Sequence, residues 1–370
     1  MRYEEPIAGP KRSFSRLEKW IYIFLTCLFI LMFLCLSLQK IHCFDVWWHL
    51  ATGKWIWTHK TIPCKDVFSY TQKGRPWTDF TWGFQALIYP IYKIGGFYGL
   101  ILFKTLVLSL AFYFLYKTLK LLTKNSLLIW FLMFSILLAS YPRFMVRPHI
   151  FGFLFVSLFL YGLNCYLQSL SWTCFLGLCL AFVIWLNLHA SFLLGLCVSG
   201  AYLIGEVTSR YNWQVKELIK LPIIRRLALL CAILMLFAFI NPYGFKLIKF
   251  ALFSHRGEGE EATRYIAEWQ SLPFKEIFLF KFNPTLFFKL IFWLAILAFI
   301  FARKPLVLRD ILIFGLFGYL TFKHARFMGL FAFTMAPIIV QWWPSFRKEI
   351  LVYTGLLAVS YTHLTLPTKA

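Results

Sequence analysis

Residues 21–38 read IYIFLTCLFILMFLCLSL, a run with no charged side chain and no proline. A helix rises about 1.5 Å per residue, so a run of this length reaches across the hydrocarbon core of a bilayer. Arg12, Arg16 and Lys19 precede the run, and no small-residue cleavage site follows it. The run is also too long for the apolar core of a signal peptide. It therefore predicts a retained transmembrane helix.

The whole chain of 370 residues has the composition that this run indicates. Hydrophobic residues make up 60% of it, charged residues only 14%, and the mean hydropathy is +0.70. A soluble domain is nearer about half apolar and about a quarter charged, so the excess apolar side chains must face lipid. In a soluble protein the formal charge of +23 would suggest nucleic acid. Here it fits basic residues that flank membrane spans, and we expect no nucleic-acid partner.

Similar apolar runs recur along the chain and predict further spans. We expect these spans at roughly 97–116, 125–140, 149–167, 172–188, 192–207, 227–240, 285–302, 308–322 and 327–342. An eleventh run begins at Ile350 and is not completed. The predicted fold is an all-α polytopic membrane protein of about 10–11 transmembrane helices, formed by residues 1–358.

The last twelve residues, 359–370, depart from this pattern. They read VSYTHLTLPTKA, which looks like the in-frame translation of a sequencing adapter, although a genuine polar tail is the alternative. We expect the natural protein to continue differently after residue 358, and we leave 359–370 out of the fold prediction.

Basic residues in the short loops predict the orientation of the spans. With a cytoplasmic N-terminus, the cytoplasmic segments hold Lys117, Lys120, Lys124, Arg210, Lys216, Lys220, Arg225, Arg226, Arg303, Lys304, Arg309, Arg347 and Lys348. The short loops on the other side hold only two pairs, Arg143 with Arg147 and Lys323 with Arg326. The positive-inside rule then places the long loops, 39–96 and 241–284, outside the cytoplasm.

The first long loop, 39–96, contains three of the chain's four aspartates. From Asp45 to Gly53 it reads DVWWHLATG, and on a helix that begins near Asp45, His49 lies one turn later on the same face. We expect this helix to lie in the membrane interface, with its Asp–His face toward a site above the membrane. Asp45 could equally be a helix N-cap.

Two further aspartates of this loop are candidate substrate-binding residues. Asp66 could bind substrate, or it could be a turn residue that accepts hydrogen bonds from its own backbone. Asp79 could also bind substrate, although its place before Phe80 favours a role as a helix cap.

Later loops on the same predicted side contribute the other candidates for substrate binding: Arg147, His149, Asn187, His189, Glu268, His324 and Arg326. Asn187 and His189 lie at the end of a span, where polar groups need partners or a water-filled cavity. Arg147 could simply anchor a helix start, and His324 with Arg326 could bind lipid phosphate. A carboxylate base together with imidazoles and guanidiniums suits attack by a hydroxyl on a carbon whose leaving group is a phosphate.

The nine cysteines show no spacing typical of a metal site. Most lie in apolar stretches, where cysteine behaves as a small hydrophobic residue. Cys43 and Cys64 share the first long loop and could form a disulfide in an oxidising compartment.

These motifs together resemble those of uncharacterised bacterial multi-spanning proteins of the C-type glycosyltransferase (GT-C) superfamily. The resemblance rests on Asp45-x-Trp-Trp-His-Leu-x-Thr-Gly, Asp66-x-Phe-Ser-Tyr-Thr, Arg147-Pro-His, Trp185-x-Asn-x-His, Asn241-Pro-Tyr-Gly, Glu268-Trp-Gln-Ser and Ala325-Arg-Phe. It covers residues 40–345, nearly all of the chain outside its ends.

The resemblance implies a multi-helix fold whose first extracytoplasmic loop is long and contains interfacial helices. It further implies a catalytic Asp or Glu in that loop, the place that Asp45 occupies, and transfer of sugars from polyprenyl-phosphate donors, typically with inversion. Bacterial relatives of this kind act in the cytoplasmic (inner) membrane on extracytoplasmic acceptors of the cell envelope. The usual second acidic residue is absent, since Val46 follows Asp45. A divalent metal is therefore left open, and no cofactor is predicted with certainty.

The resulting hypothesis is a membrane glycosyltransferase that uses Asp45 as general base and a polyprenyl-phosphate sugar as donor. Its acceptor would be an extracytoplasmic glycan, lipid or protein. Two alternatives remain: a transporter or flippase for an anionic lipid or glycan, and a non-catalytic assembly protein that keeps the fold. A transporter would carry polar groups through the depth of the bilayer, whereas the candidates here gather on one face.

Overall fold

A computed structural model describes residues 16–210, 215–253, 266–281 and 285–343. Ten long helices form the body of this part of the chain: α1 (Arg16–Ser37), α3 (Trp82–Leu122), α4 (Ser126–Ser140), α5 (Ile150–Ser169), α6 (Trp172–Leu188), α7 (Phe192–Arg210), α9 (Pro222–Phe237), α12 (Leu286–Ile300), α13 (Leu308–Lys323) and α14 (Met328–Trp342). Six segments are long and apolar enough to cross a membrane, and α6 and α12 are shorter apolar helices. The described residues include no β-strand. The prediction of an all-α polytopic membrane protein is confirmed.

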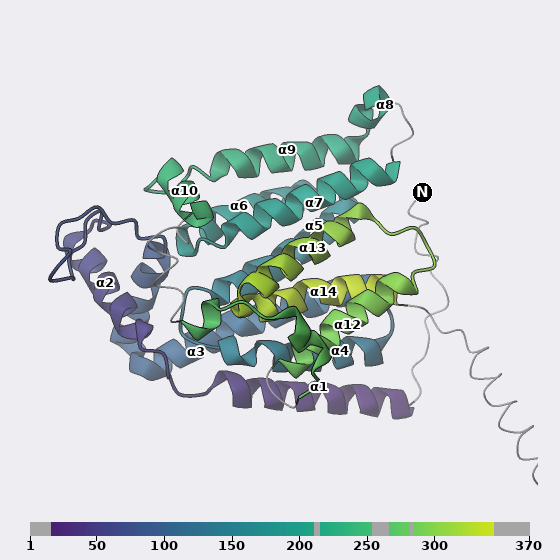
Figure 1. The fold of residues 1–370 in the computed structure, drawn as a ribbon, viewed down its shortest axis with the longest axis horizontal. Coiled ribbons are helices and arrows are strands. Elements are labelled where there is room, and N and C mark those ends of the chain that lie inside the picture. The colour runs from purple at the N-terminus through teal and green to yellow at the C-terminus, as the bar shows by residue number, and fades with distance from the viewer. Residues whose placement is uncertain (1–15, 211–214, 254–265, 282–284, 344–370) are drawn as a thin grey trace, which may run out of the picture.

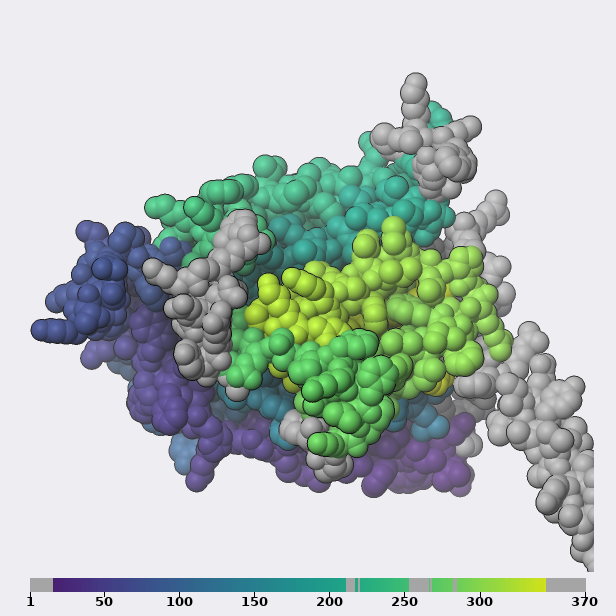
Figure 2. Space-filling view, viewed as in Figure 1, coloured from purple at the N-terminus to yellow at the C-terminus, as the bar shows by residue number. Residues whose placement is uncertain are grey.

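The remaining elements gather outside this body. They are α2 (Asp45–His59), α8 (Val215–Lys220), α10 (Phe245–Phe253) and the 3-10 turns η1 (Tyr141–Arg143), η2 (Ala267–Trp269), η3 (Phe274–Phe278) and η4 (Ala325–Phe327). Figure 1 shows the long helices side by side, with α1 along one edge and α9 along the other. We call the end that carries α2 and α10 the loop end. The first loop projects beyond the helices there, coloured purple to blue in Figure 2.

Burial differs sharply between the helices and fits their places in the bundle. In the most apolar stretches of α5 and α14, 72% of the residues are buried within the protein, against 17% in α1. Phenylalanine rings fill much of the interior, as where Phe112 and Phe153 both pack against Phe333. The exposed apolar side chains of α1, such as Phe24 and Leu31, would face lipid in a membrane.

The start of α3 differs from the sequence prediction. We expected a span from about residue 97, but the helix begins at Trp82 and continues through a break at Gly96. Gly96 has φ +57° and ψ −148°, a conformation that side chains with a Cβ rarely adopt. Residues 82–95 therefore form a separate helical leg of the first loop. The prediction missed this leg because Pro90 and the charge of Lys93 interrupt its apolar pattern.

This leg of α3 packs at close range against α2 and against the end of α6. A Cβ added to Gly53 on α2 would lie 2.3 Å from the carbonyl oxygen of Gln85, and one added to Gly83 would lie 2.4 Å from that of Asn187. Only glycine permits such approaches, so these two positions set how α2, α3 and the end of α6 meet.

A buried polar cluster lies at the end of the bundle opposite the loop end, where α13 begins and α14 ends. Arg309 pairs with Asp310 at 2.8 Å and donates to Gln341 at 2.8 Å. Asp310 also accepts hydrogen bonds from Gln341 at 3.3 Å and from Trp342 at 2.9 Å. The guanidinium of Arg309 lies 4.7 Å from the ring centre of Tyr202. We call these five residues the α13–α14 lock; the sequence reading had treated Arg309 only as an orientation signal.

Several sequence predictions fall outside the described residues. These are the eleventh span from Ile350 and the adapter-like residues 359–370.

Candidate active site

Arg147 stands at the centre of a charged cluster at the loop end. Its guanidinium lies 2.9 Å from Asp45 and 3.2 Å from Glu268, and its Nε lies 2.7 Å from the sulfur of Cys43. The first loop, the turn before α5 and the segment before α12 thus meet at one side chain. These contacts join residues more than 100 positions apart in the chain.

Two further arginines complete this cluster. Arg143 pairs with Glu268, and its own Nε is buried with no hydrogen-bond partner among the described residues. Arg326 stacks over the indole of Trp269, with its guanidinium carbon 3.7 Å from the ring centre. We call Asp45, Arg143, Arg147, Glu268 and Arg326 the arginine cluster. With three guanidiniums and two carboxylates, it carries an excess of positive charge at neutral pH.

The backbone explains where Asp45 points. Asp45 is the first residue of α2, after the N-cap Phe44, and no side chain caps this helix end. The N-cap interpretation of Asp45 is therefore wrong. Its carboxylate gains from the partial positive charge at the helix N-terminus while it faces Arg147. About half of the Asp45 side chain, 51%, is exposed, against 23% for Glu268. Asp45 is thus the carboxylate of the cluster that another molecule can reach.

The arginines keep Glu268 ionised. Burial alone would raise its pKa, but the charges of Arg143, Arg147 and Arg326 outweigh burial and lower the pKa below its usual value. The pKa of Arg147 is raised in turn, because contacts with Cys43, Glu268 and Asp45 outweigh the effect of burial. The cluster is a set of charges, not of neutral partners, over the physiological pH range.

The histidines around this cluster are neutral. Burial, and after it the charges of nearby arginines, lower the pKa of His49 and of His189 to about 3. The pKa of His149 lies well below its usual value for the same reasons, burial and the charge of Arg143. Neutral imidazoles can offer one N–H donor and one acceptor each, but no positive charge.

Hydrogen bonds orient two of these rings. His149 Nε2 donates to the carbonyl oxygen of Arg143 at 2.7 Å. His189 Nδ1 accepts from the hydroxyl of Ser191 at 2.7 Å and from its backbone N–H at 3.2 Å. Trp185 in turn donates to the Ser191 hydroxyl at 2.9 Å. The Trp185-x-Asn-x-His motif therefore builds a fixed neutral histidine at the end of α6.

The segment that carries Glu268 is held against the α13–α14 turn. His324 Nδ1 donates to the carbonyl oxygen of Trp269 at 2.7 Å, and the N–H of Ala325 donates to that of Gln270 at 3.0 Å. The pKa of His324 is lowered, first by burial and then by the charges of Arg326 and Lys323. His324 thus fixes the loop that supplies Glu268.

The structure brings most of the predicted site residues to one place and leaves three outside it. The residues in or around the arginine cluster are Asp45, His49, Arg147, His149, His189, Glu268, His324 and Arg326. Asp66 lies in an exposed turn, where Phe68 and Ser69 donate to its carboxylate. Asp66 therefore has the role of a turn residue. The hydrogen bonds from Ser69 are the chief reason that its pKa is lowered.

Asp79 lies behind the site, not in it. Its side chain is buried, and Oδ1 accepts from the N–H and the hydroxyl of Thr81 at the start of α3. We expected Asp79 to cap this helix. It does accept from the backbone at the helix start, but the residue at the N-cap position is Thr81.

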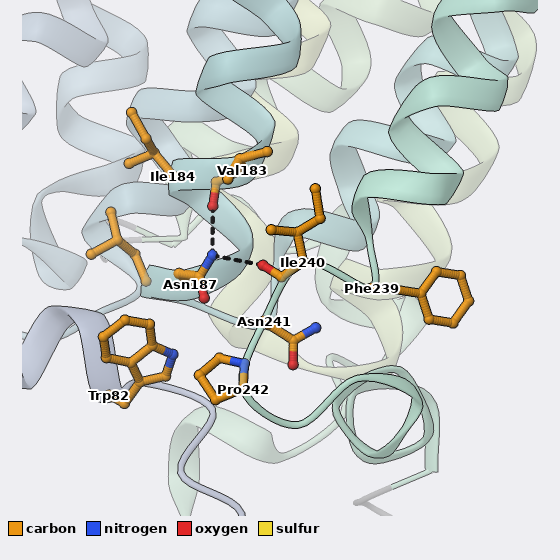
Figure 3. A pocket seen from close by; sticks show the side chains of 9 residues that line it. Trp82, Val183, Ile184, Asn187, Phe239, Ile240, Asn241 and Pro242 are labelled. Carbon is orange, nitrogen blue, oxygen red and sulfur yellow. Dashed lines mark hydrogen bonds between the residues drawn. The ribbon is translucent and has the colours of Figure 1, made fainter. Parts of the chain in front are cut away.

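Asn187 lines a groove beside the site. Its amide donates to the carbonyl oxygens of Val183 and Ile240, at 2.9 and 3.1 Å, and so joins the ends of α6 and α9 (Figure 3). The groove has a volume of about 670 Å³ and is lined by Trp82, Val183, Ile184, Asn187, Leu188, Phe239, Ile240, Asn241 and Pro242. Most of these side chains are apolar, and Leu188 at the end of α6, which directly precedes His189, is one of them.

Sequence reasoning missed Arg143, Cys43 and Trp269 as parts of the site. Arg143 had a usable signal, because it shares a short loop with Arg147 and stands four residues before it. Trp269 and Cys43 had none, since their roles arise from contacts with Arg326 and Arg147 across the fold. Cys43 and Cys64 are both free thiols, Cys43 buried and Cys64 exposed.

The carboxylates of the cluster do not form a metal site. No three His, Cys, Asp or Glu side chains in the part of the chain that the structure describes come together as metal ligands. Asp45 and Glu268 both face Arg147, whose charge would repel a cation. Within the described ranges, the residues around the cluster do not fit a divalent metal, and no step of the mechanism below depends on one.

Comparison with known proteins adds a structural class. The architecture is that of an integral membrane protein with a GT-C-like all-α fold, and twelve chains of solved structures match it. The oligosaccharyltransferase of Archaeoglobus fulgidus in its apo form matches with a TM-score of 0.57 and 13% identity over 94% of this chain. The A. fulgidus oligosaccharyltransferase AglB, in complex with an inhibitory peptide and a dolichol-phosphate, matches with a TM-score of 0.57 and 12% identity over 96%.

This chain spans about half, 53%, of the length of both archaeal proteins. No protein-family model and no curated protein sequence matches it. At this identity the similarity shows the fold, and what the chain does has to be argued from its own residues.

Proposed function

We propose that this protein is a membrane glycosyltransferase that moves a sugar from a polyprenyl-phosphate donor to an extracytoplasmic acceptor, with inversion at the sugar. One observation carries the proposal: Arg147 links the accessible carboxylate of Asp45 to a cluster with more positive than negative charge. A base and a phosphate-binding group thus stand side by side at one end of a bundle with a GT-C-like fold.

The mechanism assigns separate roles to these groups. Asp45 accepts the proton of the acceptor's hydroxyl as its oxygen attacks the anomeric carbon of the sugar. The bond from that carbon to the phosphate oxygen breaks, and the electron pair leaves with the polyprenyl phosphate. Arg147 and Arg326 stabilise the negative charge that grows on this phosphate. One direct displacement with one base and no enzyme nucleophile inverts the anomeric centre.

The groove beside Asn187 supports a lipid-linked donor. Its walls are largely apolar, it lies at the level where α6 and α9 end, and one of its lining residues, Leu188, directly precedes His189 in the chain. A polyprenyl chain in this groove would present its phosphate to the arginines. The dolichol-phosphate bound to the structurally similar AglB is a ligand of the same chemical class.

The predicted orientation gives the location. With the N-terminus in the cytoplasm of a bacterium, the loop end and its arginine cluster face away from the cytoplasm at the inner membrane. Acceptors would then be glycans, lipids or proteins of the cell envelope.

Substitution of Asp45 tests the proposal most directly. Membranes that contain the protein would be given undecaprenyl-phosphate sugars with a labelled sugar, and transfer to extracted envelope glycans, lipids and proteins would be measured. Asp45→Asn should abolish transfer, whereas Asp66→Asn, which changes an aspartate of the same loop outside the cluster, should leave it intact. Unchanged transfer in Asp45→Asn would refute the assignment. Movement of the labelled lipid across liposomes without transfer would favour the transporter alternative instead.

A further inference from the structure

A chain of four buried polar side chains connects the start of α3 with α2, behind the arginine cluster. The hydroxyl of Thr81 donates to Asp79 Oδ1 at 3.1 Å, and the amide of Gln85 lies 3.0 Å from that hydroxyl. The same amide lies 3.4 Å from His49 Nδ1. The four side chains are between 0% and 6% exposed. Buried polar groups are costly, so such a chain calls for a reason.

The direction of the hydrogen bonds follows from Asp79. Its Oδ1 accepts hydrogen bonds from both the N–H and the hydroxyl of Thr81, at 3.2 and 3.1 Å, and therefore carries no proton of its own. The hydroxyl of Thr81 donates its single hydrogen to Asp79. The oxygen of this hydroxyl must therefore accept a hydrogen bond from Gln85. The amide of Gln85 is therefore oriented with its nitrogen toward both Thr81 and His49.

This orientation decides which nitrogen of His49 carries the proton. The N–H of Gln85 makes Nδ1 an acceptor, and a neutral ring then has its hydrogen on Nε2. Nε2 lies on the side of the ring away from Gln85. The ring cannot easily turn, because Phe84 packs against it edge to face at 5.2 Å and α2 lies tightly on α3 at Gly53.

His49 lies close to the arginine cluster. His49 follows Asp45 by one turn on α2, and Arg147 is the charged group that acts on its ring. A neutral N–H donor beside guanidiniums suits an anionic oxygen, to which it adds a hydrogen bond without adding charge.

We infer that Gln85, oriented by Thr81 and Asp79, is a positioning residue that holds His49 in its Nε2–H form, and that His49 donates this hydrogen to a phosphate oxygen of the donor. The inference rests on the proposed function for its substrate, but the protonated nitrogen can be observed without any substrate. The chain of hydrogen bonds could instead serve only to join α2 to α3, and the variants below separate the two roles.

Nuclear magnetic resonance of the purified protein tests the first half. The chain has eight histidines, so the protein would be labelled with ¹⁵N-histidine and the His49 signals identified by their loss in His49→Gln. We expect Nε2 to be protonated in the natural protein. In Gln85→Leu, which removes the amide donor, a share of Nδ1–H should appear. An Nδ1–H form in the natural protein, or no change in Gln85→Leu, would overturn the inference.

Binding and transfer test the second half, with a matched pair at Thr81. Thr81→Ser keeps the hydroxyl that orients Gln85, whereas Thr81→Val keeps the shape and removes it. Loss of one well-placed hydrogen bond should weaken binding of undecaprenyl phosphate and slow transfer, each about tenfold in Gln85→Leu and several-fold in Thr81→Val. Thr81→Ser should behave as the natural protein.

The outcomes are distinguishable from a failure of the proposed function. If Gln85→Leu moves the proton on His49 and melts at the natural temperature, yet binds undecaprenyl phosphate normally, the positioning role is refuted. If the natural protein binds undecaprenyl phosphate through His49 but transfers no sugar, the proposed reaction fails and the role of Gln85 in phosphate binding stands.

Discussion

The two ends of the helical bundle each hold a charged cluster, and the clusters are built differently. In the α13–α14 lock, one arginine meets one aspartate, and Arg309, Gln341 and Trp342 supply four hydrogen bonds to Asp310. In the arginine cluster, three guanidiniums share two carboxylates, and no described residue is a hydrogen-bond partner of Arg143 Nε. A cluster that is balanced and complete serves the fold. One that keeps spare charge and an accessible carboxylate can bind something else.

Arg147 offers the largest test of this difference. Arg147→Ala should lower transfer by about 100-fold or more, the usual cost of losing a group that stabilises charge in a transition state. Its melting temperature should fall little, because Glu268 keeps Arg143 as a partner. Sugar transfer in membranes and thermal unfolding in detergent would measure the two effects. A variant that unfolds early and transfers normally per folded molecule would show that the arginine cluster, too, serves only the fold.

Asp310 offers the reverse test at the other end. Asp310→Ala leaves Arg309 buried without its partner, which costs about 3–5 kcal/mol when one member of a buried pair is removed. We expect a clear fall in melting temperature and unchanged transfer per folded molecule. Glu217→Ala, which breaks the exposed pair with Lys220 on α8, is the control and should cost much less. Loss of transfer in folded Asp310→Ala would show that the α13–α14 lock does not serve the fold alone, and would contradict the distinction between the two clusters.

These two clusters also show what the sequence could and could not predict. The long apolar runs predicted the helices, and the spacing of Asp45 and His49 predicted one helical face, because both signals are local. The pairing of Arg147 with Glu268 joins positions 121 residues apart, and no local pattern encodes it. The α13–α14 lock escaped prediction for the same reason. Charges at the ends of spans look alike in sequence whether they face lipid headgroups or each other.

Arg326 allows a finer test of what the spare charge does. Its flat guanidinium stacks on Trp269, and an ammonium group cannot reproduce that stacking or bind two phosphate oxygens at once. Arg326→Lys should therefore weaken binding of undecaprenyl phosphate about three- to tenfold while it keeps the charge. Quenching of tryptophan fluorescence would follow the titration, with undecaprenol, which lacks the phosphate, as the control ligand. Equal binding of undecaprenol would contradict a role of the cluster in phosphate recognition.

The last comparison concerns two buried aspartates, one at each end. Asp310 accepts four hydrogen bonds, whereas Asp79 accepts two from Thr81 at Oδ1, and its Oδ2 has no hydrogen-bond partner among the residues that the structure describes. Burial raises the pKa of Asp79 from 3.8 to about 6, which means that the folded protein binds this proton more tightly than the unfolded chain does. Stability from this group is therefore greatest below pH 3.8 and is lost as the pH rises to about 6, by about 2–3 kcal/mol in all.

Asp79→Asn should remove this dependence. Its melting temperature should change less than that of the natural protein between pH 4 and about pH 6.5, the window in which the folded and unfolded carboxyl groups differ in protonation. Asp66→Asn provides a control of opposite sign, because the pKa of Asp66 is lowered by Ser69 and its stability contribution is lost on acidification. The melting temperature of Asp79→Asn could instead depend on pH as that of the natural protein does. The hydrogen bonding of Asp79 would then have to be as complete as that of Asp310. The incomplete hydrogen bonding that sets the loop end apart would then be confined to the arginines.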